Sequence, residues 1–138
     1  MIPEDQINIQ KIAEIFQSAF MDVNDITDTR LSVKGVIFPF LLGVNIDTER
    51  KIVRFNDYNK LHRLSIEAAA QLCNEANKTY FLARFYAFMH ERDVMAKTEY
   101  EMSYEKGIIP FQVISNFRKF EQIAGTAVRD SFKDYLRP

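Results

Sequence analysis

The spacing of hydrophobic residues changes along the chain, and this change constrains the fold more than any other feature. Residues 4–22, 66–76 and 111–135 carry apolar side chains at intervals of three and four, which predicts amphipathic helices. Residues 30–55 and 80–104 carry them at intervals of two, which predicts three strands and then two more. Because strand runs and helices follow each other in the order α-β-β-β-α-β-β-α, we expect an α+β protein with an antiparallel sheet.

The segment 80–104 is the clearest hairpin, with Glu91 and Arg92 as its turn residues. This turn places Arg84 directly opposite Glu99, and the alternation then separates two faces. The face that we expect to form the core carries Phe81, Ala83, Phe85, Ala87 and Met89, opposite Met102, Tyr100, Thr98, Ala96 and Val94. The other face is half aromatic, with Tyr80, Leu82, Tyr86 and Phe88. Such a face either binds a partner or is a second buried face.

The composition is that of an ordinary globular chain. Hydrophobic residues make up 47% and charged residues 27% of the 138 residues, so we expect one domain over residues 1–138. The net charge of −1 lacks the basic field that nucleic acids attract. No apolar run approaches the about 20 residues that span a bilayer. We therefore expect no nucleic-acid partner, no membrane partner and a cytoplasmic location, which the single cysteine also fits.

Residues that could carry chemistry are few and scattered. The two histidines, His62 and His90, have no nucleophile or metal-ligand motif beside them. Cys73 lies on an alanine-rich helix face, which indicates a buried structural thiol. Glu99 and Glu101 have the spacing of paired carboxylates, but Arg84 opposite them favours a solvated ion-paired surface. We expect no catalytic residue, no metal and no cofactor.

Several segments together carry a family resemblance. Residues 72–107 read LCNEANKTYFLARFYAFMHERDVMAKTEYEMSYEKG, in which LCNEAN ends a helix and ERDV forms an acidic hairpin tip. A long helix containing FRKFEQI follows, and the hairpin FPFLLGVNIDTERKIVRF precedes them. This pattern resembles the YbjN family of bacterial sensory transduction regulators. The resemblance implies a fold like that of type III secretion chaperones, which often dimerises and binds protein segments.

The resemblance and the aromatic sheet face lead to one functional expectation. We expect a non-enzymatic, homodimeric regulator or chaperone-like module that binds a protein in bacterial stress or signalling regulation. The candidate partner-binding residues are Leu82, Tyr86, Phe88, Phe132 and Tyr135, because aromatic side chains dominate interface energies. The alternative is a small-ligand sensor that binds a metabolite between the sheet and the helices.

Overall fold

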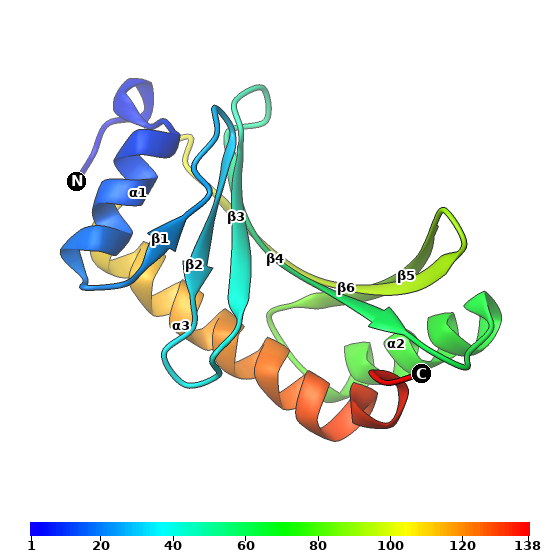
Figure 1. The fold of residues 1–138 in the computed structure, drawn as a ribbon. Helices are drawn as coiled ribbons and strands as arrows, with labels where there is room; N and C mark the ends of the chain where they lie inside the picture. The colour runs from blue at the N-terminus through cyan, green and yellow to red at the C-terminus, as the bar shows by residue number, and fades with distance from the viewer. The chain divides into compact units, whose positions relative to one another are not determined.

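The computed structural model describes all 138 residues and contains a six-stranded antiparallel sheet and three α-helices (Figure 1). The strands are β1 (Val23–Asn24), β2 (Arg30–Lys34), β3 (Leu41–Asp47), β4 (Ile52–Leu61), β5 (Arg84–His90) and β6 (Asp93–Ser103). They lie in the sheet order β1-β2-β3-β4-β6-β5. The helices are α1 (Ile9–Ser18), α2 (Ile66–Thr79) and α3 (Pro110–Ala127). The predicted α+β class is confirmed.

The chain forms two compact units. The first consists of Met1–Phe55 and Glu101–Glu121, and the second of Asn56–Tyr100 and Gln122–Pro138. Each unit is therefore built from two stretches of chain. The single domain over residues 1–138 stays a prediction.

In the first unit, α1 is shorter than expected at both ends. It begins after Asn8, whose side chain accepts a hydrogen bond from the Lys11 amide at 2.8 Å. It ends before Phe20, which has a left-handed conformation with φ of 62°. Glu4–Gln6 form a separate 3₁₀ turn. The predicted range of 4–22 therefore joined two short elements, because its apolar spacing continues across the cap.

The strands of the first unit follow the alternation of the sequence, with one addition. Leu31 pairs with Val44 and Val33 with Leu42, and all four side chains are buried. Strand β1, which pairs with β2, was not predicted, because two residues are too short to show an alternation. Pro39, which cannot donate a backbone hydrogen bond to a sheet, lies in the loop between β2 and β3.

Phenylalanines form the centre of the first unit. The rings of Phe16 and Phe117 are 5.0 Å apart, and those of Phe55 and Phe117 are 5.4 Å apart, in both cases nearly perpendicular. Phe120 packs against Phe55 from the same helix as Phe117. These edge-to-face contacts join α1, β4 and α3 within this unit. Figure 1 shows α1 alongside β1 and β2.

The loop between β2 and β3, residues 35–40, is fastened by Glu121 from α3. Its Oε2 accepts hydrogen bonds from the amides of Ile37 and Phe38, at 2.7 and 2.9 Å. A Cβ at Gly35 would lie 2.2 Å from the carbonyl oxygen of Phe38 and 2.6 Å from that carboxylate oxygen. The loop is therefore closely packed against the buried carboxylate of Glu121. The Oε1 atom of this carboxylate has no hydrogen-bond partner.

In the second unit, α2 covers one face of β5 (Figure 1). Ser65 caps the helix, because its hydroxyl accepts a hydrogen bond from the Ala68 amide at 3.1 Å. Small side chains on α2 allow the helix to approach the sheet closely. The buried core of the unit comprises Leu61, Ala69, Cys73, Ala76, Phe85, Ala96, Ala127 and Phe132. Cys73 is buried, as predicted.

The hairpin of β5 and β6 has the predicted register. Arg84 pairs with Glu99, and Tyr86 pairs with Lys97. The turn is closed by Glu91, whose φ of 57° is left-handed although the residue is not glycine. Strand β5 begins at Arg84 and not at Tyr80, so the residues before it lie outside the sheet.

The chain after α3 does not continue as one α-helix to residue 135. Val128–Phe132 form a π-helical turn and Lys133–Tyr135 a 3₁₀ turn. Phe132 ends the π-helical turn and points into the core, where its ring lies 6.2 Å from that of Phe85. The apolar stripe of this segment therefore serves packing. None of the helices combines the length and the apolar character needed to cross a membrane.

Candidate partner-binding surface

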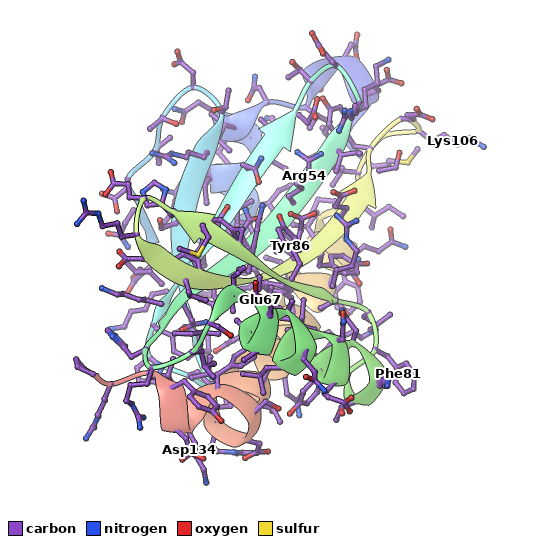
Figure 2. All side chains as sticks on the ribbon, turned by 90° about the vertical axis from the view of Figure 1, so that its right-hand side faces the viewer. Arg54, Glu67, Phe81, Tyr86, Lys106 and Asp134 are labelled. Carbon is purple, nitrogen blue, oxygen red and sulfur yellow. The ribbon has the colours of Figure 1, made fainter.

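Three aromatic rings lie on the face of the second unit that faces away from its core. Tyr86 and Phe88 come from β5 and Tyr58 from β4, and the Phe88 ring centroid is 6.2 Å from each tyrosine ring. Because Phe85 and Ala87 point into the core, the strand alternation places Tyr86 and Phe88 on the opposite side. Figure 2 shows Tyr86 on the other side of the β5 and β6 ribbon from Glu67 of α2. Tyr58 is 51% and Tyr86 39% exposed.

The side chain of Lys97 in β6 lies close to both tyrosine rings. Its ammonium lies 5.3 Å from the Tyr58 ring centroid and 5.6 Å from that of Tyr86, both within the range of cation–π attraction. The same ammonium is 2.8 Å from a carboxylate oxygen of Glu99. Tyr58, Tyr86, Phe88 and Lys97 are called the aromatic surface below.

The pKa of Lys97 is raised. Burial alone lowers the pKa of an ammonium, but here the hydrogen bonds to Glu99 and to the Tyr86 and Tyr58 side chains outweigh that effect. Lys97 is therefore charged near neutral pH. The two tyrosine rings are held around this cation.

Glu99 is the anion under this surface. It accepts from Arg84 and from Lys97, and it is only 4% exposed. The predicted Arg84 pairing is confirmed, but the prediction of a solvated carboxylate is wrong, because neighbouring side chains cover it. The Arg84 side chain is exposed, whereas the carboxylate that it pairs with is covered.

The five residues predicted to bind a partner do not lie together. Tyr86 and Phe88 belong to the aromatic surface, whereas Leu82 is 61% exposed in the segment before β5. Tyr135 packs partly against the core. Phe132 is fully buried, so it has no exposed ring to offer a partner. The helical spacing that suggested an exposed stripe at Phe132 arises from core packing.

Tyr58 was not predicted, and the reason lies in its neighbours. The sequence pattern ended the strand at Phe55, because Asp57 and Asn59 occupy positions where the alternation expects apolar side chains. Strand β4 nevertheless continues to Leu61. The apolar residue at position 61, in phase with Phe55, is the signal that could have extended the strand.

Asp57 is a buried carboxylate near this surface. It is 7% exposed, and the Asn59 side chain donates a hydrogen bond to it at 3.0 Å. Burial raises the pKa of Asp57 to about 6, and the hydrogen bonds from Asn59 and the Tyr58 amide oppose this rise only in part. The carboxyl group therefore titrates within a pH range that cells reach.

Other groups with possible chemistry are isolated. Burial raises the pKa of the Cys73 thiol to about 11, so the reactive thiolate is scarce near neutral pH. No group of three or more His, Cys, Asp or Glu side chains is arranged to hold a metal ion.

A separate groove of about 480 Å³ lies in the first unit, between α1 and the start of α3. Its walls are mainly apolar, and Lys11 and Glu14 form an ion pair of 3.2 Å at its side. The lining residues are Ile2, Lys11, Glu14, Ile15, Ser18, Ala19, Pro110, Phe111 and Ile114. The groove lies between two helices, and not between sheet and helices as the ligand-sensor alternative expected.

Comparison with known proteins gives one informative result. No family model matches the chain, and no curated protein matches it in sequence. The fold is similar to that of YbjN from E. coli, described as a candidate transcription regulator, with a TM-score of 0.73. The match covers 96% of this chain and 97% of that one, at 9% sequence identity. The chain thus has the YbjN fold, which confirms the resemblance at the level of architecture.

Proposed function

We propose that this protein is a non-enzymatic binding module that holds a protein partner on its aromatic surface and works as a cytoplasmic regulator or chaperone-like factor. The observation that carries the proposal is the arrangement of Tyr58, Tyr86 and Phe88 around the charged Lys97. Rings held in this way lose little freedom on binding, so their contact area contributes to affinity at a small entropic cost.

The same arrangement defines the chemistry of the partner. Exposed tyrosine rings favour apolar or aromatic side chains. A protein segment that presents an aromatic residue fits this feature. The net charge of −1 favours a protein over a nucleic acid as the macromolecule that is bound.

Position-specific photo-crosslinking in the source cells tests this proposal. A benzoylphenylalanine at position 86 should give discrete adducts with a protein partner. The matched control places it at Glu75, an exposed position on α2, on the opposite side of β5. Adducts from position 86 alone support the proposal. Equal adducts from both positions, or none from either, would reject the aromatic surface as the binding site.

We also propose that the protein acts as a homodimer, which the resemblance to secretion chaperones suggests. Sedimentation over a concentration series should show a dimer. If the aromatic surface forms the interface, replacing Tyr86 and Phe88 with Ser should yield folded monomers, because interface aromatics contribute more to association than to the fold. A wild-type monomer at all concentrations would exclude the homodimer but would leave the crosslinking test in force.

A second candidate function is supported by the groove between α1 and α3. Its volume falls within the range of small-ligand sites, and its apolar walls fit an apolar metabolite. An apolar dye that fluoresces on burial should bind the wild type, and Ala19→Phe should displace it by filling the groove. The control is Ala68→Phe on the exposed part of α2. Equal dye binding by both variants would reject this site.

A further inference from the structure

The loop between β2 and β3 exposes apolar side chains that no part of the proposed function uses. Val36 is 69% and Ile37 60% exposed, and Leu41 at the start of β3 is half exposed. Residues 36–41 read VIFPFL, an uninterrupted apolar run. Connecting loops are normally polar, so an exposed apolar run of this length indicates an interaction site.

This loop is held in a defined conformation. Glu121 binds the amides of Ile37 and Phe38, and the Gly35 amide donates to the Phe40 carbonyl at 3.0 Å. The rings of Phe38 and Phe40 pack together at 5.9 Å. The backbone of the loop is thus fixed from within the unit, while the side chains of Val36 and Ile37 are exposed. Figure 1 shows the loop projecting beyond the ends of β2 and β3.

Basic side chains flank the loop. Lys34 directly precedes it, and Arg118 lies one helical turn before Glu121 on the same side of α3. Both are exposed, and neither has an ion-pair partner in the structure. The acidic residue beside them is Asp22, whose carbonyl accepts from the Lys34 amide, while Glu121 is buried. At the surface, the rim of the loop therefore carries two basic side chains, Lys34 and Arg118, and one acidic side chain, Asp22.

We propose that this loop is a peripheral membrane contact that inserts Val36 and Ile37 into the interface of an anionic bilayer. A projecting aliphatic tip with a basic rim fits a deformable apolar layer covered by negative head groups, whereas a protein partner would need a matching cavity. This departs from the expectation of no membrane partner, which rested on the absence of a spanning run. It is independent of the aromatic surface.

Vesicle binding tests the proposal with the intact chain. The protein should bind phosphatidylglycerol vesicles and bind phosphatidylcholine vesicles at least tenfold more weakly, and high salt should weaken the binding. Val36→Ser with Ile37→Ser should reduce the partition coefficient at least tenfold. The matched control, Phe81→Ser with Leu82→Ser, removes two exposed apolar side chains of the other unit and should bind like the wild type.

Charge reversal gives a second readout. Lys34→Glu should lower binding to anionic vesicles about fivefold or more, since each basic residue near such a surface contributes about 1 kcal/mol. Lys106→Glu, a change of charge at an exposed turn, is the control. Circular dichroism establishes that each variant is folded.

A tryptophan probe locates the contact, since the chain has no tryptophan of its own. With Ile37→Trp, emission should shift to the blue on addition of anionic vesicles, and with Phe81→Trp it should not. No vesicle binding at millimolar lipid, or a blue shift from both probes alike, would overturn the proposal. Binding to soluble polyglutamate without binding to vesicles would assign the loop to an acidic protein and overturn the lipid assignment.

Discussion

At the scale of single residues, two buried carboxylates, Asp57 and Glu121, are held by hydrogen bonds. Asp57 lies on the core side of β4, with Asn59 as a hydrogen-bond donor. Glu121 lies in the first unit, where one oxygen is bonded twice and the other not at all. An ionised carboxylate in such surroundings destabilises the fold unless its hydrogen bonds compensate for lost hydration. Burial disfavours the charged form of Asp57, so its replacement should stabilise the fold. Glu121 holds two amides of a loop, so its replacement should destabilise the fold.

Replacing Asp57 with Asn should stabilise the protein at pH 7.5. The pKa of Asp57 is about 6 in the folded chain, above the ordinary 3.8, so the folded state binds the proton more tightly. Wild-type stability should thus rise as the pH falls from 6 towards 4, and above pH 6 the charged group should cost up to about 3 kcal/mol. Urea denaturation from pH 4.5 to 8 measures the difference between the two curves.

The control for Asp57→Asn is Asp28→Asn, at an exposed position. Its stability curve should stay parallel to that of the wild type. If the curves of Asp57→Asn and the wild type are also parallel between pH 4.5 and 8, the carboxyl group does not titrate in that range and the expected destabilisation is absent.

Replacing Glu121 with Ala should destabilise the protein by about 2–4 kcal/mol, because the amides of Ile37 and Phe38 lose their hydrogen-bond acceptor and a cavity forms. Glu121→Gln keeps an acceptor oxygen and should cost less. Chemical denaturation measures both, with Glu105→Ala at an exposed turn as the control. Equal stability of Glu121→Ala and the control would show that the loop does not depend on this carboxylate.

At the scale of elements, the β5–β6 hairpin is held in register by its core face although its turn is strained. Phe85 and Ala96 are buried, so slippage by one residue would turn both towards solvent. The backbone of Glu91 is strained at the turn, since a left-handed conformation is unfavourable for residues other than glycine. Packing outweighs the local preference of the turn.

Replacing Glu91 with Gly should therefore stabilise the hairpin by about 1 kcal/mol, because the strain is relieved. Thermal unfolding should show a higher midpoint. The adjacent Arg92→Gly is a fair comparison, since Arg92 has no left-handed conformation to relieve and should gain nothing. A lower midpoint for Glu91→Gly would mean that the glutamate side chain contributes more than the strain costs.

At the scale of the whole molecule, three elements contribute residues to both compact units. The boundaries fall within β4 after Phe55, within β6 after Tyr100 and within α3 after Glu121. None of these positions lies in a flexible linker, because each is inside a hydrogen-bonded element. Separate unfolding of one unit would therefore have to interrupt these elements.

We accordingly predict one cooperative unfolding transition. A single tryptophan at Phe38 reports on the first unit and one at Tyr80 on the second, and neither side chain is fully exposed. Both probes should give the same urea midpoint as circular dichroism, after correction for the stability of each variant. If fluorescence and circular dichroism give different urea midpoints for the same variant, the chain consists of two domains.

The sequence by itself determined the class of the fold, the position of the main helices and strands, and the register of the β5–β6 hairpin. These features depend on periodicity and on turn length, which are local and can be read along the chain. The pairing of Arg84 with Glu99 follows from this information alone.

Only the tertiary structure decided which of these residues form surfaces. Tyr58 joins Tyr86 and Phe88 because β4 and β5 flank β6, a neighbourhood that sequence spacing does not encode. Phe132 turns inward and Glu121 reaches a loop more than 80 residues away, since burial depends on what packs across from each side chain. Periodicity predicts which residues lie on the same face of a helix or strand. Contacts between residues distant in sequence determine whether that face is buried.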